Sequence, residues 1–429
     1  MTEFRFKPRG YKHFDRGVGQ SFVDSTANPD FVAAHVFSPL IHYVKSTKRY
    51  KAKKHKVELK PRPIMYASHR DACILARYAA SLNKRLDEHY SAQGLTDCVI
   101  AYRALGKGNY HFSAEAYQHA VQNAPCTIMA FDVSGFFDNL NHKHLKSRLK
   151  TLLGVSSLSS DWHNVFRAVT RFRYVLLDDL QKHPVFGPRL REKSTAPVGT
   201  VAEIKAASIM LRPNGQQFDP PRPGEAGIPQ GTPISAALSN VFMIEFDEKA
   251  KSFCDGIDAL YRRYSDDIIV ICKPDDAAAV QAEIENLMTA EGLELSKDKT
   301  EITQFDIRTP GAPAAREFAQ YLGFTYYHGS AGLRPSSISR QWRKLRQALA
   351  HAEGAARKGS GTLYTRKLRK RFAAIHDLSA GAPLRNFPSY ARRSATAFGQ
   401  SRIIKKQVQR LERTLLDGIK RIKDDMSGP

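Results

Sequence analysis

Three aspartates in this sequence stand where carboxylates could do chemistry: Asp132, Asp266 and Asp267. Asp132 follows the apolar run of residues 126–131, and the other two form the end of YSDD (264–267), between apolar segments. A carboxylate beside buried strands needs a partner, a cap or a metal ion, because burying a bare charge is costly. An Asp–Asp pair is also ordinary turn chemistry. If both sites lie on neighbouring strands, their oxygens could hold two divalent cations such as Mg²⁺, which is the arrangement that nucleotidyl transfer uses.

Strands and helices must position these aspartates. Residues 126–133 predict a buried strand that ends at Asp132, and residues 259–272 predict two strands joined by a tight turn at Ser265–Asp266–Asp267. Apolar residues near helical spacing predict a helix over 71–90. Residues 142–176 also have a helical pattern, whereas the proline-rich stretch 185–226 predicts loops.

Five short segments occur in a fixed order over about 190 residues: FDVSGFFD (131–138), GIPQGTPISAALSN (227–240), YSDD (264–267), a Gly-Leu-x-Leu-x(3)-Lys-Thr stretch (292–300) and YLGF (321–324). Together they closely resemble the palm motifs of the reverse transcriptases. The resemblance covers roughly residues 35–330. It implies an α+β right-hand polymerase fold of fingers, palm and thumb, with an antiparallel palm sheet and a basic α-helical thumb. The expected domains are an N-terminal extension with fingers (1–125), a palm with a fingers insertion (126–330) and the thumb (331–429).

The resemblance implies roles for the residues of the first motif and of YSDD. Asp132 and Asp266 match the metal ligands of the family, Asp267 the acid that supports them, and the Val133 carbonyl a further ligand. The implied cofactor is a pair of Mg²⁺ ions, for which Mn²⁺ can substitute. Phe137 stands where the family has an aromatic residue against the sugar; a ring there would collide with a 2′-hydroxyl and favour deoxynucleotides. The alternative is that Phe137 only fills the core.

The PQG segment predicts a turn followed by a helix. Gly227 and Gly231 permit a tight backbone turn, and Gln230 resembles the residue that lines the nascent base pair. Thr232 and Pro233 predict the N-cap and first turn of the helix. Its inward-facing residues would be Leu238, Val241 and Phe242.

Three cations and one further motif complete the expected site. Lys60 and Arg62 resemble the fingers cations that hold the triphosphate, with solvent or template phosphates as the alternative contact. Lys299 resembles the lysine thought to protonate pyrophosphate; a salt bridge at the end of a strand or helix is the alternative. The YLGF segment resembles the primer grip, which implies primer contacts by Tyr321, Leu322 and Gly323.

The charge of the chain predicts a polyanionic partner. It has 66 Lys and Arg against 42 Asp and Glu, a net charge of +24, which favours nucleic acid over an anionic membrane. Residues 331–429 contain 23 of these cations and 6 of the acids, a net +17. Two amphipathic helices, one around 338–349 and one over 402–423, are expected there, with a flexible loop at 353–362. The cations expected to bind nucleic acid are Arg340, Arg343, Lys344 and Arg346.

Several classes of protein do not fit the sequence. The five cysteines are scattered and never in CxxC spacing, which disfavours a disulfide scaffold or zinc ribbon and suits a reducing compartment. No apolar run approaches the roughly 18 residues of a membrane span, and the first residues lack the apolar stretch of a secretory signal. We therefore expect a cytoplasmic protein without membrane association.

The segments 35–51 and 99–117 are similar to the bacterial "unknown group" or defence-associated branch of the family, most of all to defence-associated reverse transcriptase type 2. That similarity implies anti-phage defence, with a structured non-coding RNA as template, dNTPs as substrates and a nascent cDNA as product. The Val-Thr-Gly element of retrons and the Gly-Phe-Arg-Pro stretch of group II intron proteins are not found. Two alternatives stay open: a maturase-like RNA-binding protein of a group II-type element, and a template-independent or protein-primed DNA polymerase.

Overall fold

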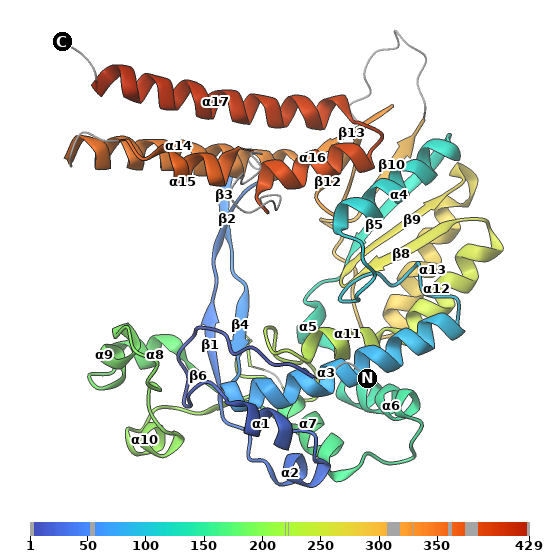
Figure 1. Ribbon diagram of the computed structural model, residues 1–429. Coiled ribbons are helices and arrows are strands. Elements are labelled where there is room, and N and C mark those ends of the chain that lie inside the picture. Colours follow the sequence, from blue (N-terminus) through green and yellow to red (C-terminus); the bar gives the residue numbers. More distant parts are fainter. Residues whose placement is uncertain are drawn as a thin grey trace.

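The computed structural model describes residues 4–51, 56–218, 220–221, 223–306, 318–327, 329–358, 363–373 and 385–426. Figure 1 shows three parts: the fingers at the lower left, the palm on the right and a helical part across the top. This is the right-hand α+β architecture that the sequence predicts. No helix in the described ranges is long and apolar enough to cross a membrane.

The palm is a four-stranded antiparallel sheet in the order β10 (Glu301–Phe305), β5 (Cys126–Asp132), β9 (Asp267–Cys272) and β8 (Leu260–Tyr264). Its two central strands are apolar almost throughout because both faces of the sheet are covered. Ile268 and Val270 face α12 (Ile244–Gly256) and α13 (Ala277–Ala290), whereas Ile269 and Ile271 pack in the cluster that contains α4 (Asn109–Gln122). The three strands predicted around the aspartates are confirmed.

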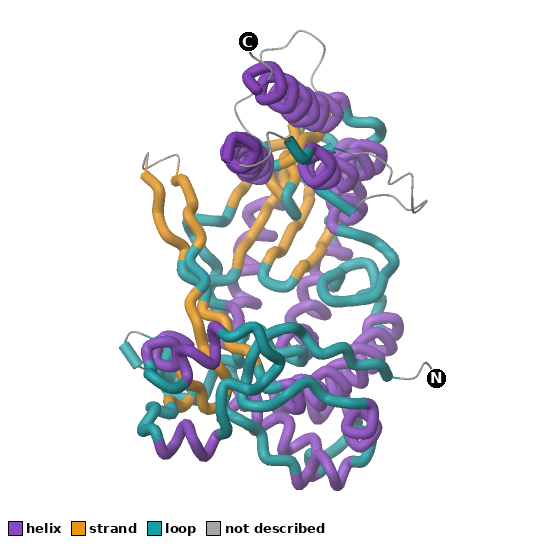
Figure 2. The backbone as a smooth tube through the Cα atoms, turned by 60° about the vertical axis from the view of Figure 1, so that its left-hand side comes forward, coloured by secondary structure: helices purple, strands orange, loops and turns teal. Residues whose placement is uncertain are grey.

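The fingers contain a second sheet in the order β4 (Pro63–Tyr66), β1 (Leu40–Val44), β6 (Arg173–Leu176) and β7 (Arg212–Pro213). The helix predicted over 71–90 is α3 (His69–Ala92), and the Ser68 side chain caps its start by accepting a hydrogen bond from the Asp71 N–H. The hairpin of β2 (Thr47–Lys51) and β3 (Lys56–Lys60) stands out from the fingers as a long arm (Figures 1 and 2). Residues 52–55, which follow β2 in the chain, lie outside the described residues.

The helical part consists of α14 (Pro335–Lys358), α15 (Thr365–Phe372), α16 (Phe387–Ala397) and α17 (Arg402–Met426). The two amphipathic helices predicted there are confirmed, and most of their buried leucines and isoleucines share a small core. Ile338 and Ile404 pack instead in the cluster that also contains residues of the palm. This part is joined to the palm through the sheet β11 (Ala319–Tyr321), β12 (Phe324–Tyr327) and β13 (Ser330–Leu333), because α17 packs on β13 and the Gln407 side chain bonds the Leu333 backbone. Strand β13 therefore crosses the domain limit expected at residue 330.

Three expectations about local structure are wrong in part. Residues 142–176 are not continuously helical: α6 (His142–Leu153) ends at Gly154, which has φ +70°, α7 spans Ser160–Thr170, and residues 173–176 are β6. The stretch 185–226 contains two short helices, α9 (Phe186–Arg191) and α10 (Val201–Ala206). The loop expected at 353–362 is helical up to Lys358, and residues 359–362 lie outside the described residues.

The helix after the PQG turn starts later than expected. It is α11 (Ser235–Phe242), so Thr232 is not its N-cap. The Thr232 hydroxyl instead bonds the Ser235 hydroxyl (2.6 Å), and Ser235 donates to the Pro229 carbonyl. The polar side chains thus stabilise the preceding turn rather than the helix end. Leu238, Val241 and Phe242 are buried as predicted.

Candidate active site

The ends of β5 and β9 bring the three aspartates together. In the register of these antiparallel strands Asp132 lies directly opposite Asp267. The Val133 N–H donates a hydrogen bond to the Asp266 carbonyl (3.2 Å). Strand pairing therefore places Asp132 and Asp267, which are 135 positions apart in the chain, at one edge of the palm sheet.

A buried network that sequence reasoning missed holds the turn before Asp266. Ser265 has φ +61°, a left-handed conformation that costs energy for a residue other than glycine. The Arg263 guanidinium donates to the Ser265 carbonyl (3.1 Å), and the Tyr102 hydroxyl donates to the Ser265 hydroxyl (3.0 Å). Arg263 itself forms a bidentate ion pair with Asp247 of α12. The signal in the sequence was Arg263 within an apolar strand, because a buried arginine requires a buried acid.

The carboxylates at this edge repel one another. Although the Asp267 side chain reaches solvent, partial desolvation together with the charges of Asp266 and Asp132 raises the pKa of Asp267 to about 6. Desolvation, and then the charge of Asp132, also raise the pKa of Asp266, while the cations Lys299 and Arg62 act in the opposite direction. A cation bound between these carboxylates would offset their repulsion and lower the pKa of both Asp266 and Asp267.

Lys299 partly supplies such a charge. Its ammonium group donates to Oδ1 of Asp132 as an ion pair. The loop before Lys299 is fixed to the same strand end, since the Ser296 N–H donates to the Asp132 carbonyl (2.7 Å) and the Ser134 N–H to the Glu294 carbonyl (2.8 Å). The structure thus brings Lys299 to the aspartates.

The donor set suits a divalent metal ion by its chemistry. Carboxylate and carbonyl oxygens are hard ligands of the kind that Mg²⁺ prefers, and Asp132, Asp266, Asp267 and the Val133 backbone supply them at one edge. Among the described residues, no three acidic, histidine or cysteine side chains converge as a ready-made metal centre. Since Lys299 bonds one of the carboxylates, a cation that uses the Asp132 carboxylate would compete with this ion pair.

Phe137 and Gln230 lie in two segments that pack together. The Ile228 N–H donates to the Phe137 carbonyl, and the Met65 N–H of β4 donates to the Gln230 carbonyl (both 2.9 Å). Phe137 belongs to the short helix α5 (Phe136–Asn139); its half-buried ring also packs against the main core, so a purely structural role stays open. Gly231 has φ +127°, and a Cβ atom there would lie 2.6 Å from the Met65 carbonyl oxygen. Only glycine permits this close approach of palm and fingers.

The two fingers cations differ in position. Arg62 is exposed, shares two backbone hydrogen bonds with Lys45, and its charge acts on Asp266. Lys60 is exposed at the end of β3, opposite Thr47 in the hairpin. The structure therefore brings Arg62 towards the aspartates and leaves Lys60 on the arm.

The YLGF segment forms a tight turn beside the site. Leu322 (φ +45°) and Gly323 (φ +90°) connect β11 to β12, as in a type I′ hairpin turn. The Tyr321 side chain is only 4% exposed and packs in the core, so it is not available to a primer. Arg334, which sequence reasoning missed, donates its backbone N–H to the Gly323 carbonyl (2.9 Å), and its charge acts on Asp267.

The four thumb cations are exposed on the first half of α14. Arg340, Arg343 and Lys344 share one helix face because residues three and four apart are neighbours. Arg346 lies towards the adjacent side, three residues after Arg343. All four side chains are exposed, whereas Leu345 and Leu349 of the same helix are buried.

Residues 189–326 match the sequence profile of the family described as reverse transcriptase (RNA-dependent DNA polymerase). The matched stretch contains the PQG turn, YSDD, Lys299 and the whole YLGF turn, whereas Asp132 and Phe137 precede it. No curated protein sequence matches the chain.

Solved structures similar to the chain come from two kinds of polymerase. Apo telomerase from Candida tropicalis, truncated from its C-terminal domain, is 12% identical over 69% of this chain and 55% of that chain, with a TM-score of 0.43. Telomerase from Candida albicans, in complex with a TWJ fragment of telomeric RNA, is 11% identical over 95% and 62%, with a TM-score of 0.42. The RNA-dependent RNA polymerase of a human picobirnavirus, an insertion-loop deletion mutant, is 11% identical over 91% and 59%, with a TM-score of 0.42.

The chain spans between 55% and 62% of the length of these three chains. The sequence profile therefore makes residues 189–326 similar to the reverse transcriptase family.

Proposed function

We propose that the protein is an RNA-directed DNA polymerase that adds deoxynucleotides to a primer 3′-hydroxyl. The observation that carries this proposal is that Asp132, Asp266 and Asp267 lie at the adjoining ends of β5 and β9, with Asp266 and Asp267 inside the stretch that matches the reverse transcriptase family. Two Mg²⁺ ions bound there would activate the hydroxyl and stabilise the leaving pyrophosphate oxygen.

Each neighbouring residue has a task in this proposal. The three carboxylates, with the Val133 carbonyl, hold the cations, and the Arg263 network fixes the turn that presents two of them. Arg62 contributes positive charge on the fingers side of the site, where the triphosphate would bind. Lys299, bonded to Asp132 in the structure, lies within reach of the site and supplies a proton to the departing pyrophosphate.

Phe137 supports a DNA product. Its backbone carbonyl accepts a hydrogen bond from Ile228 of the segment that also contains Gln230, which supports a position of the ring near the nascent base pair. An aromatic ring beside the sugar excludes a 2′-hydroxyl by its volume.

The finer part of the proposal concerns template and biology. The similarity of residues 35–51 and 99–117 to the defence-associated branch supports a cytoplasmic enzyme of bacterial anti-phage defence. Its template would be a dedicated structured non-coding RNA, which the excess of cations in residues 331–429 would hold.

The test is a primer-extension assay with the purified protein, dNTPs and Mg²⁺, combined with sequencing of any co-purified RNA. The variant Asp266→Ala/Asp267→Ala should lose incorporation. Asp275→Ala/Asp276→Ala is the matched control, because this second Asp–Asp pair follows the other end of β9 in the turn Pro274–Asp276. A discrete RNA and a DNA complementary to it are the expected products. Activity retained in the first variant, or products without a complementary template, would contradict the proposal.

A further inference from the structure

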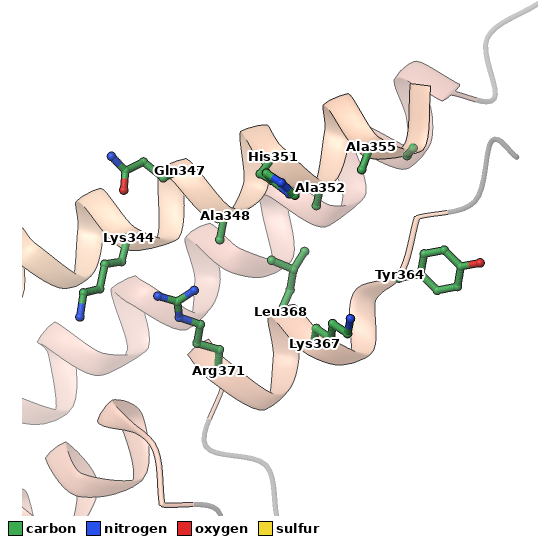
Figure 3. A pocket seen from close by; sticks show the side chains of 11 residues that line it. Lys344, Gln347, Ala348, His351, Ala352, Ala355, Tyr364, Lys367, Leu368 and Arg371 are labelled. Carbon is green, nitrogen blue, oxygen red and sulfur yellow. The ribbon is translucent and has the colours of Figure 1, made fainter. Parts of the chain in front are cut away.

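The helical part contains a cavity that the polymerase chemistry does not use. It lies between α14 and α15 and has a volume of about 600 Å³. Figure 3 shows Ala348, Ala352 and Ala355 along the α14 wall and Leu368 of α15 on the opposite side. Both helices pack on α17, which fixes them relative to each other, so the small alanine side chains leave the space between them unfilled.

Positive charge surrounds this apolar space. Lys344, Lys367 and Arg371 line it, and no carboxylate of the described residues does. None of the three forms an ion pair with an acid in the part of the chain that the structure describes. Tyr364, at the start of α15, also lines the cavity and is 74% exposed, a large apolar ring left in solvent.

We propose that this cavity binds an unpaired nucleotide of single-stranded RNA. A base is a flat body with apolar faces, and its backbone carries an anionic phosphate on either side. The base would enter between the alanines and Leu368, with Tyr364 as a stacking surface, while Lys344, Lys367 and Arg371 bind the flanking phosphates. The volume lies in the range of small-molecule sites. An acidic polypeptide could use the cations but would leave the apolar space empty.

The inference rests on the proposed function only for the choice of RNA, since binding here needs neither dNTPs nor the three aspartates. It can therefore be tested apart from polymerisation, with a short fluorescein-labelled oligoadenylate as the probe and fluorescence anisotropy at constant salt as the measurement.

The first variant fills the cavity without changing its charge. Ala355→Trp places a large ring in the space, and because Ala355 is exposed the helix should tolerate it. The matched control is Ala350→Trp, at an exposed position of the same helix that does not line the cavity. We expect Ala355→Trp to weaken RNA binding roughly tenfold and Ala350→Trp to bind as the wild type does.

A second comparison identifies the base as the occupant. An abasic oligoribonucleotide of the same length keeps the phosphates but lacks the bases. It should therefore bind the wild type more weakly than oligoadenylate does, and it should bind Ala355→Trp and Ala350→Trp with equal affinity. Tyr364→Ala should weaken binding of oligoadenylate, whereas Tyr364→Phe, which keeps the ring, should not.

The inference would be overturned if the two tryptophan variants bound oligoadenylate with equal affinity, or if the wild type bound oligoadenylate and the abasic strand with equal affinity. It would also be overturned if the affinities of the two tryptophan variants for poly-glutamate, or for single-stranded DNA, differed as much as their affinities for RNA. Primer extension on a preformed short duplex separates this outcome from the proposed function. The Ala355→Trp variant should retain primer extension. If the protein had no polymerase activity but still bound oligoadenylate more tightly than the abasic strand, the proposed function would be wrong and the cavity proposal would stand.

Discussion

Arg263 and Asp247 form an ion pair from which solvent is fully excluded. Both side chains have an exposed fraction of 0%, and Nη2 of Arg263 lies 2.6 Å from Oδ2 of Asp247. The pair is bidentate, because Nε also donates to Oδ1 at 2.7 Å. The remaining guanidinium nitrogen donates to the Ser265 carbonyl. Helix α12 is thus linked through one buried arginine to the turn that carries Asp266 and Asp267.

Asp247→Asn should strongly destabilise the protein. The substitution leaves the buried Arg263 charge without its counter-charge, which typically costs about 3–5 kcal/mol of the free energy of unfolding. Urea unfolding followed by circular dichroism measures this. The control is Asp255→Asn on the same helix, where the pair with Lys251 is solvent-exposed and should contribute less than about 1 kcal/mol. Equal effects of the two variants would show that the buried pair does not stabilise the palm.

The aspartate cluster should stabilise the protein only when a cation is bound. Removing two repelling carboxylates in Asp266→Ala/Asp267→Ala should not lower the melting temperature without metal. Added Mg²⁺ should raise the melting temperature of the wild type, because a ligand that binds only the folded state stabilises it. The double variant should not respond. Chelation by EDTA should return the wild type to its metal-free value, and an equal Mg²⁺ response of both proteins would place the cation elsewhere.

The sequence predicted the elements that local pattern determines. The apolar runs of β5 and β9 are typical of strands covered on both faces, and the pairing of these two strands explains why Asp132 and Asp267 lie opposite each other. Apolar residues at clear helical spacing likewise predicted three helices, around 71–90, 338–349 and 402–423, and all three are present.

Contacts between distant segments could not be predicted in this way. Residues 173–176 follow a helical region and become a strand only because β1 lies beside them. Nothing local indicates that Arg263 meets Asp247, or that the Met65 carbonyl approaches Gly231 so closely. The cavity between α14 and α15 likewise depends on how both helices pack on α17.

His13 should make stability depend on pH. Burial lowers the pKa of His13 from 6.5 to about 4. Its Nδ1 accepts the Phe14 N–H and its Nε2 bonds the Tyr66 carbonyl, so the ring is neutral when folded. Because the unfolded chain binds the proton more readily, stability is fully present above pH 6.5 and falls between pH 6.5 and about 4, by roughly 3 kcal/mol in total.

Urea unfolding at a series of pH values tests this. In His13→Gln, the free energy of unfolding should depend less on pH between pH 6.5 and about 4 than it does in the wild type. His163→Gln, at an exposed position of α7, should keep the pH dependence of the wild type. If the free energies of unfolding of the two variants have the same pH dependence, protonation of His13 does not cause the loss of stability at low pH.

Shrinking Phe137 should relax the choice of sugar. Phe137→Ala and Phe137→Val remove ring volume, so incorporation of ribonucleotides relative to deoxynucleotides should rise roughly tenfold or more. Single-nucleotide extension with dNTP and rNTP measures the ratio. Phe137→Tyr, which keeps the ring, is the control. An unchanged ratio in an active Phe137→Ala enzyme would mean that the ring only packs against Phe136 and the core.

The cations of α14 should determine how long nucleic acid stays bound. If Arg340, Arg343, Lys344 and Arg346 bind phosphates, affinity for a primer–template should fall log-linearly with salt, by about 0.7–0.9 log units per tenfold salt for each phosphate neutralised. Replacing all four with Gln should flatten this slope and shorten the products. Single-nucleotide addition on a saturating duplex should persist, because the palm carboxylates lie at the ends of β5 and β9 and not on α14.

The matched control removes the same charge from two helices outside the thumb, α3 and α6. Lys84, Arg85, Lys143 and Lys146 are exposed on α3 and α6, and their replacement lowers the net charge of +24 equally. If both quadruple variants flatten the slope to the same extent, the effect belongs to overall charge. If the α14 variant has the same affinity as the wild type and the same dependence of affinity on salt, these four residues do not bind nucleic acid. A flattened slope in the α14 variant only is the result expected of a thumb, since counterion release counts the cations that replace salt on the phosphates.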